Sequence, residues 1–384
     1  MGEQRLGGGW TAREIRQQPA TWPQVADAVA RARADVDRLL GAALADPRTR
    51  IVLTGAGTSA FVGEVVARDL AHHLGRPVET IPTTDVVADP RGAVVDDRPV
   101  LLVSFARSGN SPESVAAADL LRRLTPRLWH LVITCDPSGD LARRWSTDED
   151  AVVVTLPDEV NDRGFAMTSS FTGMALAALL AFGIDVDVEE LARAGSSVLD
   201  DADRRAFAIA DAGPTRLVYL GSGPLLGLAR EAALKCLELT RGEVVGIAES
   251  SLAFRHGPKS VLHDRTVAVV FLSTDPYTRS YDEDIARELV LELGRDRVVV
   301  VGPREVDDCG GARVWTVPCA PGWSSAVWSL VAVIAAQSTA LACSLALGLE
   351  PDNPFPGGEV NRVVRGVVVH EFDEKEVGSD VPRS

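Results

Sequence analysis

Lysine is nearly absent from this sequence of 384 residues: only Lys235, Lys259 and Lys375 stand among its 39 basic residues. Acidic residues number 54, so the formal net charge is -15. A surface of that sign repels phosphate backbones and anionic headgroups, and we therefore expect neither nucleic acid nor a membrane surface as a partner. An anionic small molecule would need a local pocket of arginines, hydroxyls or backbone amides.

Paired cysteines are also missing. The five cysteines are scattered, without a Cys-x-x-Cys pair or the Cys/His spacing of a zinc site. We therefore expect no metal and no cofactor, and reduced thiols, which are typical of a cytoplasmic protein. The first residues contain no apolar stretch of secretory-signal length, which also favours the cytoplasm.

Long uncharged runs are few, but residues 322–349 form one that could span a bilayer by length alone. Several serines, a threonine and a glutamine interrupt it, and a similar uncharged run occurs at 171–183. We interpret both runs as buried core helices, because two such runs at corresponding places are typical of a repeated soluble core.

The chain contains the same pattern twice. Apolar strand-like runs separated by helix-length segments occur in the first half at 51–54, 78–81, 100–104, 130–134 and 152–156, and in the second half at 217–220, 244–248, 267–272, 298–301 and 314–317. Near-continuous Val, Ile and Leu strands indicate parallel sheets covered on both faces. The sequence therefore predicts an α/β protein with two tandem doubly wound sheets of the flavodoxin-like αβα type.

Residues ahead of and between the two halves read as helices. Thr11 and Glu14 have the spacing of a capping box, and the apolar residues that follow keep helical spacing. The stretch 188–211 is a helical linker. We expect an N-terminal helical segment at 1–48, a first domain at 49–200 and a second domain with a C-terminal tail at 201–384.

Two loops of the first half could hold a phosphate. Thr58 and Ser59 follow a glycine-rich turn after the first strand, and Ser108 and Ser111 follow the third strand, with Arg107 beside them. Hydroxyls and amides at helix starts form anion sites. The first loop also fits the GxGxxA form of a dinucleotide fingerprint, with Glu79 as its acid, and both loops could simply cap helices.

Groups that could move a proton follow in the second half. Lys235 and Glu238 are three residues apart, so they share one helix face. His256 precedes Gly-Pro in a turn at the predicted start of another helix. An exposed ion pair and a turn histidine are the alternatives, but a carboxylate, an amine and an imidazole together could carry out acid/base chemistry.

Four blocks, at 104–114, 161–171, 254–260 and 353–366, resemble the sugar isomerase (SIS) domain family over nearly the whole chain. The nearest likeness is to the AgaS-type group, described as galactosamine-6-phosphate deaminase/isomerases and often labelled tagatose-6-phosphate ketose/aldose isomerases. The isomerase half of glucosamine-6-phosphate synthase is more distantly similar. The resemblance implies two SIS domains and a phosphorylated amino sugar as substrate.

The resemblance also implies residue roles. Thr58, Ser59, Ser108 and Ser111 match phosphate-binding positions, Glu238 matches the isomerisation base on a helix shared with Lys235, and His256 matches a ring-opening histidine supplied by the neighbouring subunit of a homodimer. Further substrate contacts are expected from the residues in or near matching blocks: Arg107, Phe165, Thr168 and Arg365.

The expected reaction carries a proton from C2 to C1 of an amino-sugar 6-phosphate and releases ammonia, giving a ketose 6-phosphate. With a 2-hydroxy sugar the same groups would perform plain aldose/ketose isomerisation. A third possibility is a non-catalytic phosphosugar sensor, since SIS domains also serve transcriptional regulators. The mixed charge of residues 1–50 argues against a DNA-binding segment.

Overall fold

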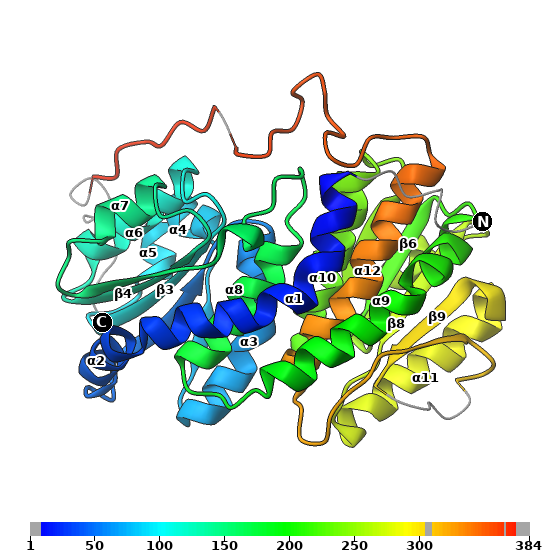
Figure 1. Ribbon diagram of the computed structural model, residues 1–384, viewed down its shortest axis with the longest axis horizontal. Helices are drawn as coiled ribbons and strands as arrows, with labels where there is room; N and C mark the ends of the chain where they lie inside the picture. The colour runs from blue at the N-terminus through cyan, green and yellow to red at the C-terminus, as the bar shows by residue number, and fades with distance from the viewer. Residues whose placement is uncertain (1–8, 304–308, 365, 374–384) are drawn as a thin grey trace.

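Two five-stranded parallel sheets lie side by side in the computed structural model, which describes residues 9–303, 309–364 and 366–373 (Figure 1). The strand order is β2-β1-β3-β4-β5 in the first sheet and, read in the same direction, β7-β6-β8-β9-β10 in the second. The predicted fold class and all ten predicted strands are confirmed. In each sheet the strand order reverses at one point, between β1 and β3 or between β6 and β8, and such switch points form crevices at the carboxyl ends of the strands.

The first sheet has helices on both faces. Its strands are β1 (Arg50–Thr54), β2 (Val78–Thr80), β3 (Val100–Ala106), β4 (Leu128–Thr134) and β5 (Ala151–Thr155). The outer face is covered by α4 (Thr83–Ala88), α5 (Pro90–Ala93), α6 (Pro112–Leu124) and α7 (Asp140–Trp145). The inner face packs on α3 (Thr58–Leu74) and α8 (Ser169–Ala181).

The second sheet repeats this layering. Its strands are β6 (Arg216–Leu220), β7 (Val245–Glu249), β8 (Thr266–Phe271), β9 (Val298–Gly302) and β10 (Arg313–Thr316). Helix α11 (Pro276–Leu293) covers the outer face, while α10 (Pro224–Leu239) and α12 (Ser325–Ala346) lie inside. Short 3-10 turns occupy Asp158–Val160, Ala253–Arg255, Pro258–Val261 and Arg295–Arg297.

The inner helices of both halves share one hydrophobic core. Among the described residues, α12 is the helix long and apolar enough to cross a membrane, and its most apolar window is entirely buried inside the protein. Two of its polar side chains are bonded internally: the Gln337 amide oxygen accepts from Gln18, and the Thr339 hydroxyl donates to the Ala335 carbonyl. The prediction that 322–349 contains a buried core helix is confirmed.

The N-terminal segment forms α1 (Trp10–Arg31) and α2 (Arg33–Leu44), and α9 (Val188–Ala210) is the predicted linker helix. The predicted capping box is wrong. Helix α1 begins at Trp10, and the Asp352 carboxylate accepts hydrogen bonds from the amides of Trp10 and Thr11. The Glu14 carboxylate instead accepts the amides of Arg163 and Gly164. A partner 341 residues away in sequence therefore replaces the local cap.

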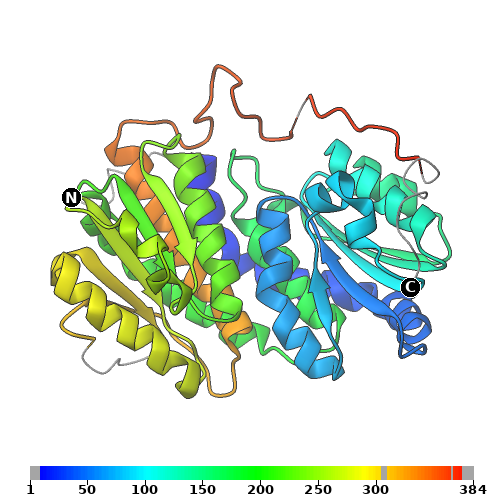
Figure 2. The same cartoon turned by 180° about the vertical axis from the view of Figure 1, so that it is seen from behind.

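Helices α3 and α10 lie against each other between the two sheets and run in opposite directions (Figure 2). Thr58, at the start of α3, meets Lys235 near the end of α10. Near the middle, a side chain on Gly227 would collide with Glu64 and Val65, so glycine permits the close approach. The pair thus connects the crevice of one sheet with that of the other.

Candidate active site

The two predicted phosphate loops meet at the carboxyl ends of the adjacent strands β1 and β3. With the C-terminal segment they enclose a cavity of about 110 Å³, whose lining includes Ser59, Arg107, Ser108 and Ser111. Helix α6 begins after Ser111, but the Ser111 hydroxyl bonds to the hydroxyl of Ser114 at 2.6 Å and not to a backbone amide. The first-turn amides of α6 therefore have no side-chain cap from Ser111, which favours an anion at this helix start.

Lys235 is the buried centre of the site. Its ammonium donates to the Thr58 hydroxyl at 3.0 Å and to the Glu238 carboxylate one turn along α10. Lys235 is fully buried, whereas the Glu238 side chain is 23% exposed. The alternative of a solvent-exposed ion pair is therefore wrong. Glu238 is the member of the pair that is accessible to solvent.

A second carboxylate, Glu231, lies on the other side of Lys235, with Oε1 3.6 Å from the ammonium. Burial raises the pKa of Glu231 to about 8, although Lys235 acts in the opposite direction. Burial lowers the pKa of Lys235, but the charges of Glu231 and Glu238 more than offset it, so the net direction is upward. Lys235 is consequently an ammonium at neutral pH, a hydrogen-bond donor and not a base.

Arg107 joins the phosphate loops to two other segments of the chain. Its guanidinium donates to the carbonyl of Phe165 at 3.2 Å and to that of Arg362 at 2.7 Å, while Arg362 donates to the carbonyls of Gly164 and Asp162. Burial, followed by the charge of Arg362, lowers the pKa of Arg107. The Arg107 Nε is buried and has no hydrogen-bond partner among the described residues, so one N–H remains for a ligand.

The loop before α8 is held by Asp162, a buried carboxylate. It accepts the backbone amide and hydroxyl of Thr168 at 2.8 and 2.9 Å, and further amides from the first turn of α8. The Thr168 hydroxyl therefore orders this loop, and the Phe165 ring packs on Phe355. Met167 is the loop residue that lines the cavity. Arg365, also predicted to contact substrate, lies outside the described residues.

His256 is not brought to this site by its own chain. It is exposed and lies between the two 3-10 turns Ala253–Arg255 and Pro258–Val261, not at the start of a longer helix as predicted. Within the described residues, no hydrogen bond or ion pair joins it to Lys235 or Glu238. Lys259, three residues later, forms ion pairs with Glu288 and Glu292.

The described residues contain no group of three or more His, Cys, Asp or Glu side chains arranged to hold a metal ion. Cys135, Cys236 and Cys343 are free thiols. Glu79, the acid considered for a dinucleotide ribose, is bound by Arg50 through both carboxylate oxygens, at 2.8 and 2.6 Å. That ion pair removes the support for the dinucleotide alternative.

Sequence reasoning missed Glu231 and Arg362. Glu231 precedes Lys235 by four residues, and this helical spacing predicts a contact that could have been recognised. Arg362 lies in one of the quoted blocks, but no periodic pattern places that block beside the first sheet. Its position depends on the irregular C-terminal segment, which crosses from the second half to the first (Figure 1).

Two tandem αβα units, with a hydroxyl-lined crevice at the strand ends of the first, define a sugar isomerase type of protein. The SIS domain family model matches residues 43–183. A Streptomyces coelicolor AgaS protein is 53% identical over 95% of this chain and 96% of its own length. The Escherichia coli protein named D-galactosamine-6-phosphate deaminase AgaS is 40% identical, with coverage of 95% and 96%.

Solved structures agree with this grouping. The crystal structure of tagatose-6-phosphate ketose/aldose isomerase from Escherichia coli is 38% identical to this chain, with a TM-score of 0.88, and the match covers 95% of this chain and 97% of that one. The chain belongs to the AgaS family of SIS-domain proteins.

Proposed function

We propose that this protein is a phosphosugar deaminase/isomerase that converts galactosamine 6-phosphate and water into tagatose 6-phosphate and ammonia. The substrate class is that of the AgaS relatives. The observation that carries the proposal is the hydrogen bond between Thr58 and Lys235. Thr58 is the neighbour of Ser59, which lines the cavity, so this bond connects the cavity wall to the ion pair of Lys235 and Glu238.

The phosphate occupies the small cavity. Its volume of about 110 Å³ equals roughly four water molecules in the liquid, which suits a phosphate group but not a whole hexose phosphate. Ser59, Ser108 and Ser111 provide hydroxyls, and the free N–H of Arg107 provides a charged donor. The sugar then extends from this anchor towards Glu238, and the bound phosphate fixes C1 and C2 in place.

Glu238 is the base. In the open-chain aldehyde it removes the proton from C2, and the electron pair forms a C1–C2 double bond while O1 becomes an oxyanion. The Lys235 ammonium stabilises that charge. Protonation of O1, and of C1 by Glu238, gives a primary alcohol and a C2 iminium. Water adds to C2 and ammonia leaves, so atoms and charge balance without an oxidant.

Ring opening requires a further acid/base group, and His256 takes this role from the partner subunit of a homodimer. The proposal is supported by the exposure of His256 and by the lack of any hydrogen bond or ion pair from it to Lys235 or Glu238 within the described part of its own chain. The test mixes Glu238→Gln and His256→Ala subunits under conditions that allow exchange. Half of the dimers are then mixed, and each contains one complete site of two, so roughly a quarter of wild-type activity should return. If the mixture stays inactive after exchange of subunits between the two variants has been verified, a site shared between subunits is contradicted.

The assay of the main proposal measures ammonia release from galactosamine 6-phosphate and glucosamine 6-phosphate side by side, with tagatose 6-phosphate and fructose 6-phosphate as the products to detect. Ammonia and tagatose 6-phosphate from the galacto sugar support the proposal. Interconversion of tagatose 6-phosphate with its aldose, without ammonia from either amino sugar, would establish a simple isomerase instead. Tight phosphosugar binding without any turnover would indicate a sensor.

A further inference from the structure

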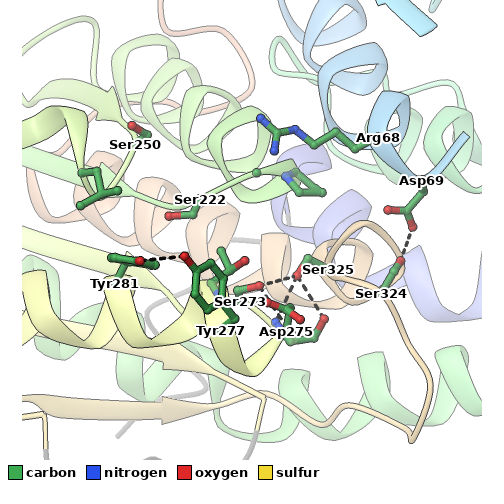
Figure 3. Close-up of a pocket in the computed structure, with 15 residues that line it drawn as sticks. Arg68, Asp69, Ser222, Ser250, Ser273, Asp275, Tyr277, Tyr281, Ser324 and Ser325 are labelled. Atoms are coloured by element: carbon green, nitrogen blue, oxygen red, sulfur yellow. Dashed lines mark hydrogen bonds between the residues drawn. The ribbon is translucent and has the colours of Figure 1, made fainter. Parts of the chain in front are cut away.

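A second cavity, of about 470 Å³, lies at the carboxyl ends of β6 and β8 in the second sheet (Figure 3). Its place in the fold is equivalent to that of the first crevice, because the strand orders are the same. The turn after β6 also repeats the turn after β1: Gly223 has φ 62° and ψ -127°, and Gly57 has φ 55° and ψ -126°. We refer to this cavity as the second crevice.

The side chains of the second crevice differ from those that would hold a phosphate. The positions of Thr58 and Ser59 are taken by Pro224 and Leu225, which offer no hydroxyl. Helix α11 begins at its N-cap residue Asp275, whose carboxylate accepts the amide of Thr278 at 2.8 Å. A carboxylate thus already occupies the helix start where an anion would bind. With Asp69 the lining carries two carboxylates against the one guanidinium of Arg68, so the second crevice is less suited to phosphate than the first.

Beneath the crevice lies Asp282, a fully buried carboxylate. It accepts the hydroxyls of Ser222, at 2.6 Å, and Ser251, and the amide of Ser273 at 3.0 Å. These three residues come from the loops after β6, β7 and β8, so one side chain orders all three loops. Because the hydroxyl proton of Ser222 points to Asp282, the Ser222 oxygen, which lines the crevice, is left as an acceptor.

The rim adds a carboxylate and an aromatic surface. Asp69, from α3 of the first half, accepts the hydroxyl of Ser324, so the crevice is built from both halves of the chain. Tyr277 and Tyr281 stand on α11 with their hydroxyls 2.9 Å apart and their rings edge-on at 5.4 Å (Figure 3). Aromatic rings at a wet rim suit a ligand with an apolar face and polar edges.

We propose that the second crevice binds an unphosphorylated sugar, either neutral or amine-bearing. Such a ligand has hydroxyl or ammonium donors for the serine and carboxylate oxygens, and C–H faces for the tyrosine rings. The volume lies within the range of small-molecule sites, roughly 300 to 1,000 Å³. Asp275 and Asp69 disfavour a phosphorylated sugar, although Arg68 also lines the crevice, so we expect the two crevices to distinguish sugars by the presence of a phosphate.

The test is calorimetric titration of the full-length protein with galactosamine, galactose and inorganic phosphate. We expect at least one of the two sugars to bind once per chain, without displacement by saturating inorganic phosphate. Ser222→Val and, separately, Tyr281→Ala should weaken that binding by about tenfold, since each removes a hydrogen bond or an aromatic face. The matched control, Ser108→Val in the first crevice, should leave the affinity unchanged within about twofold.

Tyr281→Ala keeps the proposal testable if Ser222→Val disturbs the fold, because Tyr281 lies at the rim and not at the floor. Melting temperatures of all variants identify any unfolded protein. Absence of sugar binding, displacement by phosphate, or loss of binding in Ser108→Val with retention in Tyr281→Ala would each overturn the second site. Ammonia release does not enter this measurement, so its result is independent of the proposed catalytic function.

Discussion

Replacement of Glu238 by glutamine separates chemistry from binding at the proposed active site. The amide oxygen of glutamine can still accept the hydrogen bond from Lys235, so the local geometry should persist. Glu238 is partly exposed, at 23%, but its partner Lys235 is fully buried. Loss of the Glu238 charge should therefore lower the free energy of unfolding by about 3 kcal/mol, so a urea denaturation curve accompanies the assay. The proton shuttle, by contrast, is removed completely.

The expected loss in kcat is about 10² to 10⁴, the usual contribution of a positioned acid/base group. KM should change little, because the proposed phosphate anchor at Ser59, Ser108 and Ser111 does not include Glu238. The assay follows ammonia release under saturating substrate, together with incorporation of solvent deuterium at C1 or C2. Both signals should fall in parallel if Glu238 carries the proton.

The matched control is Glu243→Gln, an exposed carboxylate shortly after the end of α10. It removes the same charge from the same region without touching Lys235, and should retain wild-type kcat. An unchanged kcat in Glu238→Gln would remove this residue from the mechanism. An equal loss in the control variant would show that the effect is electrostatic and general, which would also refute the assignment.

Three further predictions concern stability. Lys235→Met removes the buried cation between Glu231 and Glu238 and should lower the free energy of unfolding by about 3 kcal/mol, measured by urea denaturation; a midpoint equal to that of the wild type would contradict this. Burial, and then Asp162, raises the pKa of Glu14 from 4.5 to about 7. The folded state therefore binds the proton more tightly, and stability falls as pH rises from about 4.5 to 7, by about 3 kcal/mol from this group. Glu14→Gln lacks this titrating group, so the pH–stability curves of the wild type and the variant should differ by the Glu14 contribution between pH 4.5 and 7. Curves of the same shape would contradict the prediction. Asp352→Ala removes the side chain that accepts the first two amides of α1 and should cost about 1 kcal/mol, with an unchanged urea midpoint as the contrary result.

The elements that could be predicted from the sequence are those whose burial is local and periodic. The strand at 100–104 reads as a continuous apolar run, and β3 is buried at every position. Lys235 and Glu238 could be paired because helical geometry alone brings residues three apart together. Such features depend on neighbours within one or two turns of the chain.

Other features depend on contacts between distant segments, which spacing cannot reveal. Glu14 fits a capping box, yet its carboxylate binds the loop at Arg163 and Gly164, because α1 packs across the end of that loop. The cap of α1 comes from Asp352, in a segment without regular structure. For the same reason Arg362 could not be assigned to the cavity in advance, although its sequence block was recognised.

The antiparallel pair of α3 and α10 explains how a residue of the second half reaches the proposed phosphate site of the first. Helix α3 begins at Thr58, and its positive dipole end faces the first crevice, where it favours an anion. Helix α10 begins at the second crevice and spans 16 residues, roughly 24 Å, so its negative end reaches the first. That end stabilises the Lys235 ammonium, while Glu238 lies on the last turn, close to solvent. The duplication thus supplies one crevice with both an anion-binding helix start and a cation-stabilising helix end, and parallel packing of the same two helices would have separated them.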